Sequence, residues 1–112
     1  MNDIPMFDSS HCLPGYWETD LEGKVLVLRA DVLREADRTA QNQLWLAQSG
    51  FGCQAGSSGR AVFAASLADG AQARWNRADF VGVLQLEHLP DWARDGLRRL
   101  GIEPEPQVDM SL

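Results

Sequence analysis

Residues 43–84 read QLWLAQSGFGCQAGSSGRAVFAASLADGAQARWNRADFVGVL: two apolar runs joined by a glycine-rich loop, then a tight turn and a segment with arginine and tryptophan. In the first run, Leu44 and Leu46 alternate with Gln43, Trp45 and Ala47. Strict alternation predicts a strand, here with a large apolar group on each face. Such a strand is expected where a sheet is covered on both sides or curls into a small barrel.

The dipeptide Asp69-Gly70 lies between two strand-like runs. It is typical of a type I′ turn, because both central residues of that turn need positive φ. A two-residue turn at this point places Ala64 opposite Trp75 and Ser66 opposite Ala73. The small residues would then make room for the indole, and the sequence predicts a hairpin with this register.

Apolar runs elsewhere predict the remaining elements. Residues 25–28 are too few for a helix and predict a strand buried on both faces, and residues 80–86 predict a further strand. Gly82 in this last run indicates a bulge or a close approach of another backbone. Apolar residues at helical spacing predict a short helix over 32–37 and a longer one over 91–100.

These elements predict an α+β fold: about five strands in a strongly bent antiparallel sheet or small open barrel, with a short early helix and a C-terminal helix. We expect residues 1–16 to form an extended acidic arm, residues 17–102 a single α+β domain and residues 103–112 an acidic tail.

The net charge of −6 is concentrated at the two ends of the chain. Residues 1–23 contain five acids and no base, whereas residues 24–101 contain ten bases and eight acids. An acidic balance argues against direct binding to nucleic acid, whose affinity comes mostly from basic groups at phosphates. The ends either approach a basic partner or are solvated tails. The acids that could face such a partner are Glu18, Asp20, Glu22, Glu103 and Glu105.

No apolar run approaches the length needed to span a bilayer, and the N-terminus lacks the pattern of a signal peptide. We therefore expect a soluble, cytoplasmic protein without a membrane partner. Two cysteines, Cys12 and Cys53, are too few for a disulfide framework, and both are expected to be thiols.

Residues 49–59 contain four glycines and three serines and form the candidate functional loop. Its amides could cradle an anion with Arg60 supplying charge, or the loop could be a plain connection. The rim around it offers Phe51, Arg60, Arg77 and Asp79 as candidate binding residues. Arg60, Arg74 and Arg77 with Trp45 and Trp75 could also form a surface for single-stranded nucleic acid, although core packing of the tryptophans is the stronger interpretation.

No catalytic, metal or cofactor site is predicted. Cys53 could be a nucleophile only if a base lowered the pKa of its thiol, and no spacing proposes that base, so a small packed side chain is favoured. His11, Cys12, Cys53 and His88 have the ligand types of a zinc site without its usual spacing.

One pattern in the central region consists of Arg38, Gln43, Gly50-Phe51-Gly52-Cys53, Gly59-Arg60-Ala61-Val62-Phe63, Asp69-Gly70 and Arg74-Trp75-Asn76-Arg77-Ala78-Asp79-Phe80. This pattern resembles a small uncharacterised domain carried by conjugative and other mobile elements of bacteria. The resemblance covers about half of the chain, residues 24–84, and implies a role like that of accessory proteins which counter host defences.

Two functions follow as hypotheses. The first is a non-enzymatic binding protein of a phage or mobile element, an anti-CRISPR-like inhibitor that binds a host protein of a nucleic-acid-handling defence complex. Its acids would lie where phosphates otherwise bind. The second is a small-ligand, phosphate-binding or enzymatic domain that uses the glycine-rich loop with Arg60 and Arg77.

Overall fold

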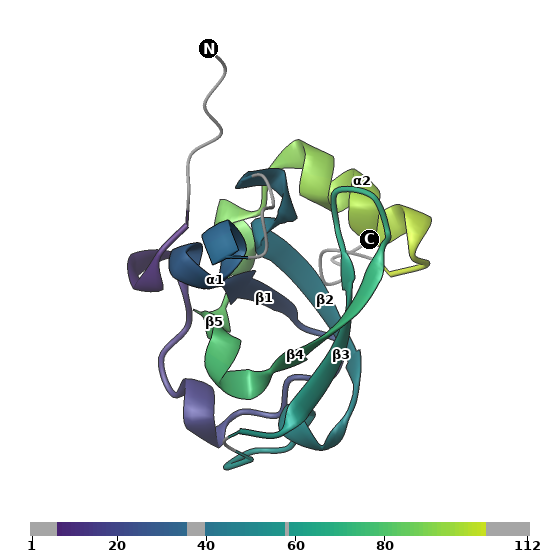
Figure 1. The fold of residues 1–112 in the computed structure, drawn as a ribbon. Coiled ribbons are helices and arrows are strands. Elements are labelled where there is room, and N and C mark those ends of the chain that lie inside the picture. The colour runs from purple at the N-terminus through teal and green to yellow at the C-terminus, as the bar shows by residue number, and fades with distance from the viewer. Residues whose placement is uncertain (1–6, 36–39, 58, 103–112) are drawn as a thin grey trace, which may run out of the picture.

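The computed structural model describes residues 7–35, 40–57 and 59–102 (Figure 1). It contains one antiparallel sheet with the strand order β4-β3-β2-β1-β5 and two α-helices. The α+β class, the five strands, the early short helix and the C-terminal helix are thus confirmed. The elements are β1 (Val25–Leu28), α1 (Ala30–Glu35), β2 (Leu44–Ser49), β3 (Ala61–Ser66), β4 (Gln72–Asn76), β5 (Phe80–Val83) and α2 (Asp91–Arg99), with short 3-10 turns η1 (Ser9–His11), η4 (Phe51–Cys53), η5 (Arg77–Asp79) and η6 (Leu86–His88).

The sheet is open, with β4 and β5 at its two ends. It is neither closed nor strongly curled, so the prediction of a strongly bent sheet or small open barrel is not confirmed. That prediction rested on the apolar groups on both faces of residues 43–48. The structure shows the other alternative for these groups, a sheet that is covered on both sides.

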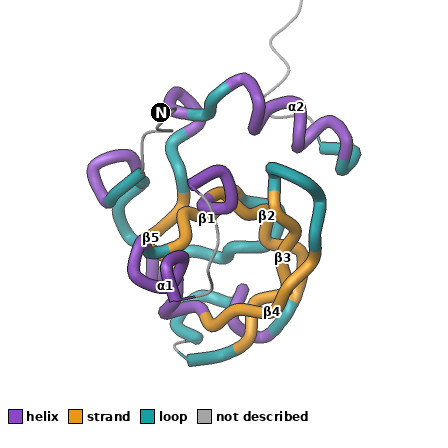
Figure 2. The backbone as a smooth tube through the Cα atoms, turned by 45° about the horizontal axis from the view of Figure 1, so that its top comes forward, coloured by secondary structure: helices purple, strands orange, loops and turns teal. Residues whose placement is uncertain are grey.

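Two apolar cores lie on the two faces of the sheet. Trp45 and Val62 face α1, whose Leu33 belongs to the first core. Leu44 and Leu46 face α2, which contributes Ala93 and Leu97 to the second core. Figure 2 shows the two helices apart, with the strands between them. All four residues of β1 are buried, as predicted for a strand covered on both faces.

The hairpin between β3 and β4 has a different register from the predicted one. Trp75 lies opposite Val62, and Ala73 lies opposite Ala64. The turn contains four residues, 67–70. It is closed by the hydrogen bond from the Ser66 amide to the Ala71 carbonyl oxygen at 2.8 Å. Gly70 takes a φ of 77°. Asp69-Gly70 therefore ends a longer turn, and the register is shifted by two residues. Such a shift keeps each side chain on its face, so Trp75 still packs on the predicted side.

Helix α2 lies unusually close to the sheet at Gly96. A Cβ atom on Gly96 would come within 2.1 Å of the Leu67 carbonyl oxygen. The helix ends at Arg99 and is followed by Gly101 with a φ of 84°. No helix within the described residues is long and apolar enough to cross a membrane.

The segment before β1 packs along the sheet from its first described residue, Phe7. The Gln43 side chain forms two hydrogen bonds with the Phe7 backbone. Its Oε1 accepts from the Phe7 amide and its Nε2 donates to the Phe7 carbonyl oxygen, each at 2.8 Å. Further along the chain, Cys12 forms an isolated antiparallel β-bridge with Leu84, and the Leu13 amide donates to the Val83 carbonyl oxygen at 2.8 Å. Residues 11–13 thus lie beside the end of β5. Residues 1–6 and 103–112 lie outside the described part.

Candidate binding surface

The Arg77 guanidinium is fully buried and binds four backbone carbonyl groups. Nη1 donates to the carbonyl oxygens of Gly52 and Gln54, both at 2.8 Å. Nη2 donates to the carbonyl oxygens of Tyr16 and, at 2.6 Å, Thr19. We call this group the Arg77 carbonyl cluster. It joins the segment before β1 to the glycine-rich loop, two parts of the chain that the sheet itself does not connect.

Two aromatic rings complete the environment of Arg77. Its Cζ atom lies 4.8 Å from the centroid of the Tyr16 ring and 5.5 Å from that of Trp17, distances at which a cation is attracted by the ring. The Tyr16 hydroxyl donates to the Arg77 carbonyl oxygen at 2.7 Å. Burial raises the pKa of the Tyr16 phenol against the opposing effect of the Arg77 charge, so the hydroxyl keeps the proton that it donates.

The structure places both Arg77 and Asp79 in structural roles. Asp79 Oδ2 accepts a hydrogen bond from the Asn76 amide at 2.8 Å and so closes the turn η5. Arg77 lies inside the molecule and cannot reach a ligand outside it. The other two rim residues, Phe51 and Arg60, are exposed.

The amides of the glycine-rich loop are largely engaged within the protein. Their acceptors are carbonyl oxygens of the loop itself, the Trp17 carbonyl oxygen and the Asp20 carboxylate. An anion cradle needs free amides that converge on one point, and these amides point to internal acceptors instead. The donors are the amides of Cys53, Gln54, Ala55, Gly56 and Ser57.

Two phenylalanines are exposed beside this loop. Phe51 is 68% exposed and Phe63 is 45% exposed. Both line a hollow of about 570 Å³ whose other lining residues are Glu22, Gly50, Gln54 and Ala61. Phe63 lies on the same face of the sheet as α2. The helix covers this face near Leu67 but leaves it open near Phe63.

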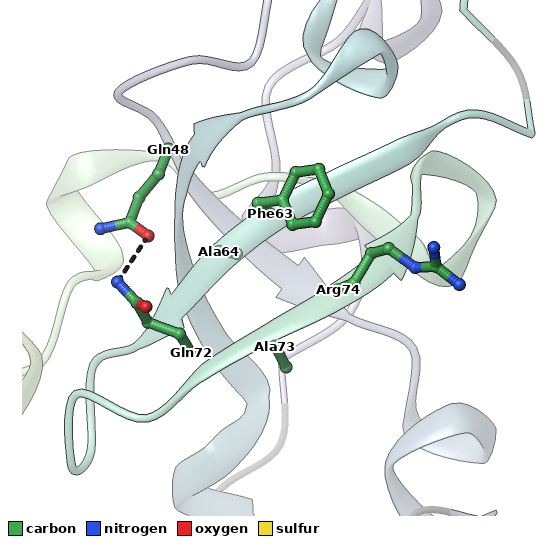
Figure 3. A pocket seen from close by; sticks show the side chains of 6 residues that line it. All are labelled: Gln48, Phe63, Ala64, Gln72, Ala73 and Arg74. Carbon is green, nitrogen blue, oxygen red and sulfur yellow. Dashed lines mark hydrogen bonds between the residues drawn. The ribbon is translucent and has the colours of Figure 1, made fainter.

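A second hollow of about 260 Å³ adjoins the first through Phe63 (Figure 3). Gln72 Nε2 donates to Gln48 Oε1 at 3.4 Å across one side of it, and the Arg74 side chain points away from this pair. We call the residues around the two hollows the Phe51–Phe63 surface. They are Glu22, Gln48, Gly50, Phe51, Gln54, Ala61, Phe63, Ala64, Gln72, Ala73 and Arg74.

The predicted acidic residues divide into three groups. Glu22 lines the larger hollow. Glu18 and Asp20 are exposed on the same segment, although Asp20 also accepts the Ala55 amide at 2.9 Å. Glu103 and Glu105 lie outside the described residues. One part of the acidic N-terminal region thus borders the Phe51–Phe63 surface.

Neither cysteine has the environment of a nucleophile. Burial, with a contribution from Glu22, raises the pKa of the Cys53 thiol, and its Sγ donates to the Ser49 carbonyl oxygen at 3.2 Å. Burial and the nearby Asp8 carboxylate raise the pKa of Cys12 to about 11. Within the described residues, no group of three or more histidine, cysteine or acidic side chains could hold a metal ion.

Alkylation by iodoacetamide should therefore be slow at both cysteines. A thiol with a pKa of about 11 in place of 9.0 has about 100-fold less thiolate at pH 8. We expect Cys12 in the native protein to react far more slowly than a cysteine in a peptide, and to gain rate as the pH approaches 11. Mass spectrometry of the two cysteine-containing peptides measures this. Fast alkylation of Cys53 at pH 7 in the folded protein would show that its thiol is activated.

The tryptophans named for nucleic-acid binding are core residues. Trp45 is fully buried, and its ring meets the half-buried Trp75 edge to face, with 5.4 Å between the centroids. Neither indole is free to stack on a base. Arg77 is buried as well, so the proposed basic and aromatic surface is not assembled.

The chain matches no protein-family model, no curated protein and no solved structure.

Sequence reasoning missed Phe63, Gln48 and Gln72 as surface residues. Their alternation in the strands does place them on one face, together with Leu44 and Leu46. What the sequence does not reveal is how far α2 extends over that face. The position of Gly96 sets where the helix packs, and a glycine in a helix gives no signal of the carbonyl group it will meet.

Proposed function

We propose that this protein is a non-enzymatic binding protein of a phage or other mobile element, and that it docks on a host protein through the Phe51–Phe63 surface. The observation that carries the proposal is the exposure of two phenylalanines around one hollow. Aromatic side chains bury large areas at interfaces, and contiguous exposed apolar patches mark interaction sites more often than plain surface. Phe51 and Phe63 would be its anchor residues.

The acids beside the hollow favour a partner with basic groups. Glu22 lines the hollow, and Glu18 and Asp20 are exposed on the same segment. Proteins that handle nucleic acid present such basic groups, and carboxylates can take the place of phosphates in pairing with them. This supports an anti-defence inhibitor of a nucleic-acid-handling complex as the first role to test, in line with the resemblance of the central region to a mobile-element domain.

A small-ligand or phosphate-binding role has weaker support from the same geometry. The amides of the glycine-rich loop have internal partners, and Arg77 binds backbone carbonyl groups. The hollow beside the loop is lined by a carboxylate and two phenyl rings, which do not favour an anion. Arg60 is the exposed base nearest to this loop in sequence, and it does not line either hollow.

The test is capture of purified host defence complexes by the wild-type protein and by a Phe51→Ser/Phe63→Ser double variant. Truncating an aromatic anchor costs about 2 kcal/mol, so we expect binding to weaken about 30-fold or more. Leu13→Ser/Leu86→Ser is the matched control, because Leu13 and Leu86 are 47% and 41% exposed and lie outside both hollows. Thermal unfolding of each variant establishes that it is folded.

Equal binding by both double variants would contradict the assignment of this surface. A Glu18→Gln/Glu22→Gln variant tests the charge component separately, since it should bind more weakly at low salt and lose part of the salt dependence. An unchanged salt dependence would rule out phosphate mimicry by these two acids and leave the aromatic contact standing.

A further inference from the structure

The outer edge of β4 carries backbone groups that the sheet does not use. Pairs of residues in an antiparallel ladder alternate between exchanging hydrogen bonds and pointing their N–H and C=O groups outward. The Arg77 amide donates to the Arg60 carbonyl oxygen, and the Ser66 amide to the Ala71 carbonyl oxygen. Between these two pairs, every second residue of β4 exchanges hydrogen bonds with β3, and these residues are Ala73 and Trp75. Gln72 and Arg74 therefore direct their backbone N–H and C=O groups away from β3.

At the other end of the sheet, part of the edge is already occupied. Residues 11–13 pair with the end of β5 and the residues after it, through the Cys12–Leu84 β-bridge and the hydrogen bond from the Leu13 amide to the Val83 carbonyl oxygen. β4 is the last strand in the order, and Gln72, Arg74 and Asn76 are exposed along it. The Asn76 amide is occupied by Asp79. Two residues, Gln72 and Arg74, thus remain to bond to an added strand.

We propose that the β4 edge receives an extended segment of the partner protein as an additional antiparallel strand, with an acidic side chain of that segment opposite Arg74. This inference rests on the proposed function and specifies how the partner's backbone attaches. An added strand satisfies the outward groups of Gln72 and Arg74 by main-chain hydrogen bonds, the usual way in which an exposed sheet edge binds a peptide. Opposite charges across neighbouring strands stabilise the pair.

Arg74 also argues against a second copy of this chain as the occupant. The two-fold register that pairs all of Gln72, Arg74 and Asn76 places Arg74 directly opposite its own symmetry mate. Like charges in that position are destabilising, and a short edge strand with a basic residue is a common device against self-pairing. A segment with a carboxylate in that place has the complementary charge.

The edge is continuous with the proposed aromatic interface. Gln72 and Arg74 line the smaller hollow, and Phe63 lines both hollows. A side chain that lies opposite Gln72 or Arg74 projects from the same face of the sheet as these residues. One partner could thus use the β4 edge for its backbone and Phe63 for an apolar side chain.

The probe is a library of phage-displayed linear peptides, selected on the wild-type protein with counter-selection on an Arg74→Pro variant. Proline at this place removes an amide that points out of the sheet, and edge strands tolerate it there. Circular dichroism and thermal unfolding establish that the variant is folded. We expect the selected peptides to carry alternating apolar residues and one acid, and to bind Arg74→Pro about tenfold more weakly than Arg74→Ala, which keeps the amide.

Amide hydrogen exchange of the wild-type protein gives a readout that needs no variant. Without peptide, the amides of Gln72 and Arg74 should exchange much faster than those of Ala73 and Trp75. With peptide bound, Gln72 and Arg74 should become protected. Peptides that bind Arg74→Pro and Arg74→Ala equally, or that leave these two amides unprotected, would overturn the inference.

The two proposals fail separately. A host protein whose binding requires Phe51 and Phe63 but leaves the Gln72 and Arg74 amides unprotected supports the proposed function and removes the added strand. A host protein could instead protect these amides and bind the Phe51→Ser/Phe63→Ser variant as well as the wild type. That result would support the added strand and contradict the aromatic interface.

Discussion

Replacing Arg77 by methionine is expected to lower the free energy of unfolding by about 4 kcal/mol. The guanidinium donates to the carbonyl oxygens of Gly52, Gln54, Tyr16 and Thr19, and methionine leaves all four without this partner. A buried acceptor that loses its only donor costs about 1–3 kcal/mol. The total is reduced here because the Tyr16 and Gln54 carbonyl oxygens keep the amides of Thr19 and Ser57, and because Nε has no partner in the native state. Urea denaturation followed by tryptophan fluorescence measures the loss.

Two further variants separate the causes. Arg77→Lys keeps the charge but loses the planar fork that reaches two pairs of carbonyl groups, so we expect about half of the loss. Arg74→Met removes an exposed arginine from the adjacent strand and should change the stability by less than about 0.5 kcal/mol. A loss below about 1 kcal/mol for Arg77→Met would show that water replaces the guanidinium at these carbonyl groups.

Gly96→Ala is expected to destabilise the protein by about 2–3 kcal/mol, although alanine is the better helix former by about 1 kcal/mol. The new Cβ atom would lie 2.1 Å from the Leu67 carbonyl oxygen, which is backbone and cannot rotate away. Helix α2 must therefore move off the sheet, and the packing of Ala93 and Leu97 on the second core is loosened. The steric term exceeds the gain in helix propensity.

Gly101→Ala is the matched control for this variant. Gly101 has a φ of 84°, and a Cβ atom there would meet nothing within 4 Å. Its substitution incurs only the left-handed backbone conformation, about 1–2 kcal/mol. Thermal unfolding of both variants tests the order. If Gly96→Ala were as stable as the wild type, the close approach of α2 to Leu67 would be wrong.

The sequence allowed the faces of the sheet to be predicted better than its shape. Alternation in residues 43–48 correctly assigned Leu44 and Leu46 to one core and Trp45 and Ala47 to the other, because side chains in a strand alternate whatever the curvature. Curvature depends on what covers each face, and this is decided by segments far away in the sequence. The turn at Asp69-Gly70 shows the same limit: the dipeptide marks a reversal but does not fix the number of residues in it.

The candidate site was predicted in part for the same reason. Phe51 lies on the surface, as its place in a glycine-rich loop indicates. Arg77 was expected on that surface too, since arginine is seldom fully buried. Its burial depends on the carbonyl groups of Tyr16 and Thr19, which lie 61 and 58 positions away in the sequence. No local sequence pattern around residue 77 predicts these contacts with Tyr16 and Thr19.

The Arg77 carbonyl cluster also constrains the order in which the chain can fold. The hydrogen bonds from Arg77 to the Tyr16 and Thr19 carbonyl groups join residues 61 and 58 positions apart. During synthesis, residues 16–19 leave the ribosome long before Arg77 does, and contacts of such long range are slow to form. These two hydrogen bonds must therefore wait until residue 77 has been made, whereas the bonds that join the same segment to Ala47, Cys53 and Gly56 can form earlier.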